Sequence, residues 1–244
     1  MTGSHWVVGF HAVLAVLEGG RPVEVAWIQA GRHDGRMRRP EEVARRRHVV
    51  VQAVSRARLE QVAEGVAHTG CAVRTGPVPW VDVTDLLAPA ALPARLLLLD
   101  GVTDPHNVGA VIRTAAAFAL DGVVLAGPAA PPLGGAVARA AAGQLERMKL
   151  ARSTVAADVL TLLRSEGYWV FGADAGGRPV DTVATTSRWI LCVGAEESGL
   201  RAKTRSRVDE WVAVPMAPGV ESLNLSVSAA VLIYELSRGL WSGG

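Results

Sequence analysis

Residues 95–101 read RLLLLDG, and this apolar run constrains the fold more than any other stretch of the chain. A strand that is apolar at every position needs cover on both faces, which is typical of a parallel sheet. From there onward, apolar strand-like runs alternate with segments of helical periodicity. The alternation predicts a doubly wound parallel α/β sheet over residues 95–244.

The first 75 residues predict a second, smaller α/β domain. The stretches WVVGF, VEVAWIQA, HVVVQAVS and CAVRTG are typical of strands, and helical segments separate them, one of them near residues 40–47. Residues 76–94 contain four prolines and little periodicity, so we interpret them as a linker. The predicted division of the 244 residues is therefore 1–75, 76–94 and 95–244.

Positive charge concentrates in the smaller domain, where nine arginines between positions 32 and 58 face three acids. Arginine clusters suit phosphate groups, because the guanidinium presents several donors in a fixed fork. For this stretch alone, a solvated helix face is an equally good interpretation. The candidate contacts to a nucleic-acid backbone are Arg38, Arg39, Arg45, Arg46 and Arg47.

The sequence contains no sign of a membrane span, a signal peptide or a metal site. No apolar run approaches the roughly 18–20 residues that a membrane helix needs, and the start of the chain lacks a basic region of the signal-peptide kind. Cys71 and Cys192 lie far apart in apolar surroundings, and the six histidines are scattered. We therefore expect a cytoplasmic protein without a disulfide or a bound metal.

Three polar motifs follow predicted strands, and the first is DPHNVGAVIRTA at residues 104–115. Asp104 is a good N-cap and Pro105 suits the first position of a helix. Asn107 then lies in the first turn, and Arg113 lies further along. Taken alone, the pair is better explained as a cap-region amide and a surface arginine, which could pair with Asp104.

The second motif is VGAEESGL, at residues 193–200. Its glycines permit a tight loop whose backbone faces a ligand. Alternatively, Glu196 and Glu197 cap a basic helix that we expect near residues 199–206, since acids favour helix N-termini.

The third motif, VPMAPGVESLNLSVSAA at residues 214–230, ends a strand and opens an apolar helix expected from about 222 to 240. Ser222 is explained by a role as the N-cap of that helix. Asn224, two positions into an apolar helix, is less easily explained in this way. Because ligands of parallel sheets bind at the carboxyl ends of the strands, the three motifs predict one site.

The absence of several known catalytic and cofactor-binding motifs limits the reactions that the candidate site could catalyse. The chain has no dinucleotide-binding glycine fingerprint, no phosphate-binding P-loop, no nucleophile elbow and no paired CxxC or HExxH motif. The candidate site offers amide, hydroxyl, guanidinium and carboxylate groups. Such a set suits a reaction whose difficult chemistry is supplied by a bound cofactor.

The three motifs, in this order, resemble motifs one, two and three of the SpoU–TrmH family of RNA ribose 2′-O-methyltransferases, within the SPOUT superfamily. The layout most resembles the bacterial 23S rRNA guanosine 2′-O-methyltransferase branch. GFHAVLAVL and AHTGCAV resemble the start and end of that family's N-terminal RNA-binding domain, which is similar to ribosomal protein L30e. The resemblance implies a deep trefoil knot in the C-terminal domain, S-adenosylmethionine as cofactor, RNA as partner, and a homodimer.

The resemblance also implies roles for individual residues. The polar residues that match the family's catalytic positions are Asn107, Arg113, Glu196, Ser222 and Asn224. Cofactor contacts are expected at Gly194, Val214 and Leu223, together with the neighbouring Ala195, Gly199 and Met216. Because an arginine stays protonated, we expect Arg113 to orient the target phosphate and stabilise the developing alkoxide. The acceptor of the ribose proton is left open.

Several functions remain compatible with the sequence. A guanosine of 23S rRNA is the favoured substrate, and the alternatives are a tRNA or an rRNA nucleotide whose methylation blocks an antibiotic. A non-catalytic RNA-binding or ribosome-assembly factor is a different class, which the complete set of five polar residues disfavours. A nucleotide-dependent dehydrogenase is disfavoured by the missing glycine fingerprint.

Overall fold

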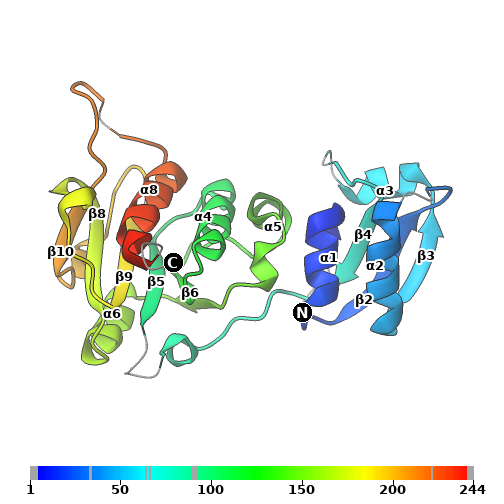
Figure 1. The fold of residues 1–244 in the computed structure, drawn as a ribbon, viewed down its shortest axis with the longest axis horizontal. Helices are drawn as coiled ribbons and strands as arrows, with labels where there is room; N and C mark the ends of the chain where they lie inside the picture. Colours follow the sequence, from blue (N-terminus) through cyan, green and yellow to red (C-terminus); the bar gives the residue numbers. More distant parts are fainter. Residues whose placement is uncertain are drawn as a thin grey trace. The chain divides into compact units, whose positions relative to one another are not determined.

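The chain forms two compact units in the computed structural model, which describes residues 5–32, 35–63, 65, 67–88, 93–220 and 222–240 (Figure 1). The first unit comprises Met1–Pro79 and Pro132–Arg147, and the second comprises Trp80–Pro131 and Met148–Gly244. Residues 89–92 of the predicted linker lie outside the described residues. None of the helices in the described part of the chain has the length and apolar character of a membrane span.

The second unit contains a parallel sheet of six strands, as the apolar alternation predicts. In chain order the strands are β5 (Ala94–Asp100), β6 (Gly122–Ala126), β7 (Leu150–Ser153), β8 (Trp169–Pro179), β9 (Arg188–Gly194) and β10 (Glu210–Ala213). Their order in the sheet is β10-β8-β9-β5-β6-β7, and every neighbouring pair is parallel. The run Leu96–Leu99 lies in the central strand β5 and is at most 1% exposed, which confirms the prediction of a strand covered on both faces.

Helices cover both faces of this sheet. They are α4 (Pro105–Ala117), α6 (Ala156–Ser165), the short α7 (Ala202–Arg205) and α8 (Leu225–Ser237), with 3-10 turns at Val83–Leu86, Val180–Thr182 and Arg238–Leu240. Leu96 and Leu98 pack in one cluster with Leu160 of α6, so Leu97 and Leu99 face the opposite side, because side chains alternate along a strand. Helices α4 and α8 pack against each other (Figure 1).

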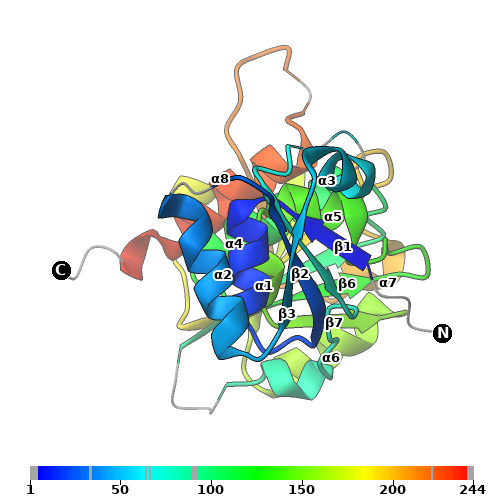
Figure 2. The ribbon, with the colours of Figure 1, turned by 90° about the vertical axis from the view of Figure 1, so that its right-hand side faces the viewer.

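The first unit has a smaller mixed sheet, with strands β1 (His5–Val8), β2 (Val23–Gln29), β3 (Val50–Val54) and β4 (Cys71–Thr75) in the order β1-β4-β2-β3. Strands β2 and β3 are parallel, whereas β4 is antiparallel to both β1 and β2. Helices α1 (Phe10–Glu18) and α2 (Gly35–Arg46) pack on one face, and α3 (Arg56–Ala63) packs on the other (Figure 2).

One sequence prediction for the first unit needs correction. Helix α2 begins at Gly35 rather than near residue 40, and Pro40 lies inside it. Burial of Met37 and Val43 in the core offsets the hydrogen bond that the proline removes. The segment Pro132–Arg147 falls within the residues 95–244 that the sequence assigns to the C-terminal domain. This segment, with α5 (Gly135–Ala141) and a 3-10 turn at Gln144–Glu146, packs with the first unit.

A buried ion pair explains why this segment belongs to the first unit. Arg21 Nη1 donates to Glu146 Oε1 at 2.5 Å, and the two side chains are only 3% and 5% exposed. Arg21 Nη2 donates to the Gly76 carbonyl oxygen at 2.5 Å and lies 3.1 Å from His5 Nε2. Burial raises the pKa of Glu146, although the Arg21 charge opposes that rise. A lone carboxylate at this depth would be costly, so the pair requires both partners.

Replacement of Glu146 by alanine should destabilise the first unit. The change leaves Arg21 buried without its counter-charge, so we expect the free energy of unfolding to fall by about 3 kcal/mol or more. Urea unfolding followed by tryptophan fluorescence measures it. The control is Glu18→Ala, because Glu18 pairs with Arg39 at an exposed position, where a loss below about 1 kcal/mol is expected. Equal effects of the two variants would contradict the structural role of the buried pair.

Candidate active site

A cavity of about 510 Å³ lies in the second unit, where residues from the middle of β8 and the ends of β9 and β10 meet the start of α8. This is the edge of a parallel sheet where ligands bind. The cavity has apolar walls and a few polar groups, which is typical of a small-molecule site. It is lined by all six residues expected to contact a cofactor, namely Gly194, Ala195, Gly199, Val214, Met216 and Leu223. Glu196, Ser222 and Asn224 also line it.

Two glycines set the shape of the loop after β9. A Cβ atom on Gly194 would lie 2.0 Å from the backbone carbon of Gly199, so no larger residue fits without movement of the backbone. Gly199 has a φ of +62°, which favours glycine. Its N–H donates to the Ala195 carbonyl oxygen at 2.8 Å and closes the loop. The backbone of the loop therefore lies directly against the cavity.

The far end of this loop is fixed to the central strand. Asp100, at the end of β5, is fully buried and accepts hydrogen bonds from Arg201 N at 3.0 Å and Arg201 Nε at 2.6 Å. The sequence analysis missed this pair, although an acid at the end of a fully apolar strand was a signal for a buried partner. The ion pair holds residues 194–201 over the end of the sheet.

Three polar side chains from three motifs form one hydrogen-bonded network. Asn107 Nδ2 donates to Glu196 Oε1 at 3.0 Å. Asn224 Nδ2 donates both to Asn107 Oδ1 at 3.0 Å and to Glu196 Oε1 at 3.1 Å. The backbone N–H of Leu225 also donates to Glu196 Oε1, at 3.2 Å. The network joins α4, the loop after β9 and the start of α8, so the structure brings these parts of the three motifs together.

Helix capping explains part of this arrangement. Asp104 accepts from the backbone N–H groups of His106 and Asn107, both at 3.1 Å, and Pro105 is the first residue of α4, so both predictions for this helix are confirmed. The predicted cap at Ser222 is wrong, because the N-cap of α8 is Asn224, whose Oδ1 accepts from Ser226 N at 2.9 Å.

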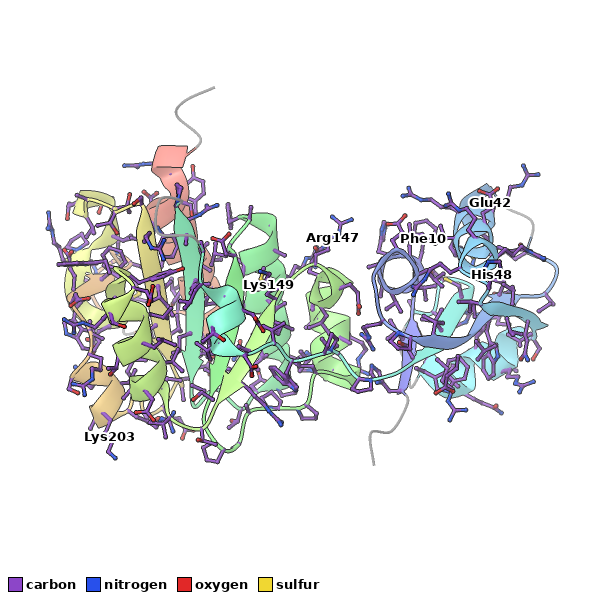
Figure 3. All side chains as sticks on the ribbon, turned by 90° about the horizontal axis from the view of Figure 1, so that it is seen from below. Phe10, Glu42, His48, Arg147, Lys149 and Lys203 are labelled. Atoms are coloured by element: carbon purple, nitrogen blue, oxygen red, sulfur yellow. The ribbon has the colours of Figure 1, made fainter. Side chains whose placement is uncertain are left out.

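The expected cap of the basic helix by glutamates is also wrong. The N-cap of α7 is Arg201, and no side chain caps that helix. Glu196 instead accepts from the first backbone N–H of α8, which lies far along the chain. Lys203, one of the basic residues of α7, is exposed (Figure 3).

Arg113 and Ser222 stand outside the network. Arg113 is exposed and makes no hydrogen bond or ion pair with any described residue, so the pairing with Asp104 is not found. It lies six residues after Asn107 on α4, which places it roughly 120° around the helix from that amide. Ser222 is exposed at the cavity and likewise has no hydrogen-bond partner in the described part of the chain.

Asp174, in β8, lines the cavity and was missed by the sequence analysis. Its carboxylate accepts from Gly176 N at 3.0 Å and from Arg205 Nη1 at 3.0 Å. The pKa of Asp174 lies below its usual range. The hydrogen bond from Gly176 N is the largest cause, and the hydrogen bond from Arg205 is the next. No motif marks Asp174 in the sequence, and β8 continues through GADAGGRP to Pro179.

The arginines of α2 divide into paired and unpaired groups. Arg47, just beyond the helix, donates to the carbonyl oxygens of Val16, Leu17 and Arg21 at 2.9–3.0 Å, so it has a structural role rather than the expected phosphate contact. Arg39 pairs with Glu18 and Arg45 pairs with Glu41.

Arg38 and Arg46 are exposed and have no hydrogen-bond or ion-pair partner among the described residues. Arg38 and Arg45 are seven residues apart, as are Arg39 and Arg46, so each pair lies on one side of the helix, about two turns apart. The exposed acid Glu42 lies on the same helix (Figure 3). Among the candidate phosphate contacts, Arg38 and Arg46 are therefore the two that have no partner within the described residues.

No group of three or more metal-ligating side chains occurs within the described ranges. The cavity instead provides apolar walls, close backbone and two carboxylates, those of Asp174 and Glu196. This set can bind an organic molecule with an apolar ring and a positive charge.

Both units match models of known protein families. Residues 94–234 match the model of the SpoU rRNA Methylase family, and residues 6–80 match the model of the RNA 2′-O ribose methyltransferase substrate binding domain. The 23S rRNA (guanosine-2′-O-)-methyltransferase RlmB of Vibrio cholerae is 37% identical over 239 residues, covering 95% of this chain and 96% of that protein.

Two further relatives are informative. An uncharacterized tRNA/rRNA methyltransferase of Synechocystis is 35% identical over 94% of this chain, and the chain spans 61% of that protein's length. The crystal structure of the SpoU methyltransferase AviRb from Streptomyces viridochromogenes, in complex with AdoMet, has a TM-score of 0.83 and 25% sequence identity. That match covers 99% of this chain and 92% of the other.

Replacement of Gly194 by alanine should distort the loop and destabilise the second unit. The added Cβ meets backbone rather than a movable side chain, so we expect the free energy of unfolding to fall by about 2–3 kcal/mol. Gly76→Ala is the control, since a Cβ there meets nothing within 4 Å. Urea unfolding of both variants tests the expectation, and an unchanged midpoint for Gly194→Ala would show that the loop tolerates a side chain.

Proposed function

This chain belongs to the SpoU rRNA methylase family, and we propose that it transfers a methyl group from S-adenosylmethionine to a ribose 2′-hydroxyl of a guanosine in 23S rRNA. The observation that carries the proposal is the network of Asn107, Glu196 and Asn224 beside the cavity. It joins the three motifs at one sheet edge, as a bound cofactor and a ribose would require. A ribosomal RNA substrate would also place the enzyme in the cytoplasm.

The cavity suits S-adenosylmethionine in size and chemistry. Its volume of about 510 Å³ falls within the usual range for such sites, and side chains such as Val193, Val212 and Leu232 offer apolar contacts for an adenine ring. Gly199 leaves its backbone open to close approach, since nothing lies within 4 Å of where its Cβ would be. The carboxylate of Asp174 provides a negative charge opposite a cationic ligand. When bound, the sulfonium supplies an electrophilic methyl group, so the protein has to hold the hydroxyl in line and remove its proton.

Arg113 would contact the RNA rather than the cofactor. A guanidinium stays protonated at any accessible pH, so Arg113 would bind the phosphate of the target nucleotide and stabilise the negative charge that develops on the ribose oxygen. Because it contacts no part of the network in its own chain, we propose that it acts within a homodimer.

The proposed dimer interface lies along α4 and α8. Val227 and Tyr234 are each 47% exposed on α8, and Phe118, at the end of α4, meets Tyr234 edge-on with ring centroids 5.9 Å apart. An exposed apolar face of this kind is a candidate for burial against a second copy. We further propose the family's trefoil knot in this unit, where Glu196 accepts a hydrogen bond from the backbone N–H of Leu225.

The first unit would bring the RNA to this site. Its match to a substrate-binding model supports a fold similar to ribosomal protein L30e, and Arg38 and Arg46 are available for phosphate groups. Separate domains for binding and chemistry allow a large RNA to be held while one nucleotide enters the catalytic unit. That nucleotide has to be unpaired or unstacked to be reached.

Methyl transfer from labelled S-adenosylmethionine to unmodified bacterial RNA tests the function. We expect label in 2′-O-methylguanosine of the 23S fraction after digestion to nucleosides. Arg113→Ala should lower the rate by about 10²–10³-fold and leave cofactor affinity unchanged by calorimetry. Arg207→Ala, which removes another exposed arginine of the second unit, is the control. Label in tRNA would overturn the substrate, and full activity of Arg113→Ala would overturn its role.

The salt dependence of RNA binding tests the role of α2. Arg38→Ala and Arg46→Ala should each weaken binding and reduce the slope of log K against log salt by about one, since each removes one phosphate contact. Arg56→Ala is the matched control, because Arg56 is already paired with Glu60 on α3. Filter binding at several salt concentrations gives the slopes. Unchanged slopes for both α2 variants would favour a solvated helix face.

A further inference from the structure

One face of the smaller sheet is only half covered by a helix. Helix α3 packs at one end of this face, around Leu59 and Trp27 (Figure 2). Directly opposed residues of neighbouring strands share a face. Beyond Trp27, the next such row crosses all four strands and consists of Trp6, Arg74, Val25 and Val50. Val50 is 58% exposed and Arg74 is also exposed, so this part of the face is open to solvent.

Two tryptophan rings form the centre of the face. Trp6 and Trp27 belong to strands on either side of β4, and their ring centroids are 4.0 Å apart with an interplanar angle of 39°. The rings can meet across β4 because Ala72, which is opposite Trp27, has a small side chain. Trp27 is 7% exposed, whereas Trp6 is only partly buried. The buried ring therefore supports a second ring that remains accessible to solvent.

The polar groups around Trp27 have unused donors. Its Nε1 can only donate, so the atom of Gln52 that it contacts at 3.1 Å is the amide oxygen. The amide nitrogen of Gln52, at an exposed position, makes no hydrogen bond with another described residue. The guanidinium carbon of Arg58 lies 4.5 Å from the centre of the Trp27 ring. An amide and a guanidinium thus flank the tryptophan pair.

The charge that remains uncompensated at this face is positive. Glu24 pairs with Arg74 at 3.2 Å, and Glu60 of α3 pairs with Arg56 at 2.8 Å. The guanidinium of Arg58 is exposed and has no hydrogen bond or ion pair within the described ranges. The first 75 residues as a whole contain 11 arginines and seven acids. A partner with negative charge and flat apolar rings is complementary to such a surface.

Unpaired RNA has both properties, in its phosphates and its bases. A protein partner fits less well, because an interface between proteins has a broader apolar centre. Among the described residues of the first unit, Val50 is the only large apolar side chain that is mostly exposed. Double-stranded RNA fits less well too, because its bases are stacked on each other and cannot reach an aromatic ring.

We propose that this half-open face binds unpaired nucleotides of the substrate RNA, an inference that rests on the proposed function. One base stacks on the accessible side of the Trp6 ring, and the amide nitrogen of Gln52 donates to an acceptor on a base edge. Arg58 contacts an adjoining phosphate. The face gives the first unit a contact for single-stranded RNA, in addition to the arginines of α2 on the other side of the sheet.

The test measures filter binding of a purine-rich single-stranded RNA of about ten nucleotides, with a fully paired hairpin of the same composition as second probe. Trp6→Leu should weaken binding of the single strand by about 5–100-fold, which is the loss of one stacked base. Its salt dependence should stay unchanged, because no charge is removed. Arg58→Ala should reduce the slope of log K against log salt by about 0.7, as expected for one phosphate of a single strand.

Two further variants separate stacking from a structural role. Trp6→Phe keeps a ring at this position, so its affinity should stay within about threefold of wild type. The quenching of tryptophan fluorescence that RNA causes in the wild-type protein should shrink in this variant, since the stacked fluorophore is gone. Trp169→Leu is the matched control, because Trp169 is 41% exposed on the second unit, and its affinity should equal that of wild type.

Two results would overturn the proposal directly. One is an unchanged affinity of Trp6→Leu for the single strand, and the other is an equal loss for the single strand and the hairpin. A Trp6→Leu variant that changes its oligomeric state in sedimentation but keeps its RNA affinity would assign the face to a second copy of the chain. Methyl transfer is measured separately, so an inactive wild-type protein would overturn the proposed function while the oligonucleotide titration still decides the role of the face.

Discussion

The hydrogen bonds that converge on Glu196 Oε1 hold the candidate site together. One donor comes from α4, and two come from the start of α8, so a single oxygen ties together segments separated by 28 to 89 positions in the chain. Each bond adds on the order of 1.5–3 kcal/mol when the acceptor is charged. The carboxylate also compensates for the unpaired backbone N–H at the start of α8. Loss of this acceptor would release both helices from the loop that lines the cavity.

The glycine loop and the buried aspartate make that convergence possible. Gly194 and Gly199 allow the backbone to fold back on itself immediately after β9. Asp100 then anchors the end of the loop at Arg201, beside the central strand of the sheet. Glu196 lies between these two constraints, so its position follows from the backbone of a rigid sheet rather than from the flexibility of its own side chain.

The sequence predicted most of the framework because apolar periodicity reports burial directly. The six parallel strands, the cap at Asp104 and the alternation in the smaller domain all follow from local pattern. What could not be predicted depends on contacts between distant segments. Nothing near Glu146 indicates that it pairs with Arg21, and nothing near Arg47 indicates that its guanidinium reaches the carbonyl groups of α1. Asp174 belongs to none of the three motifs, and its partner Arg205 lies 31 positions further along the chain. The motif residues can be recognised from the sequence. The N-cap of α8 cannot, because the choice between Ser222 and Asn224 depends on where the helix begins.

The chemical types of the network residues follow from the charge at its centre. A carboxylate at position 107 or 224 would face Glu196 at about 3 Å and raise the energy of both ionised groups. A hydroxyl has a single O–H to donate, whereas the Asn224 amide donates to both Asn107 and Glu196. The amide does so without a charge of its own, and at position 224 it also caps α8. Two asparagines around one glutamate therefore orient the carboxylate through Oε1 and leave Oε2 without a hydrogen-bond partner among the described residues.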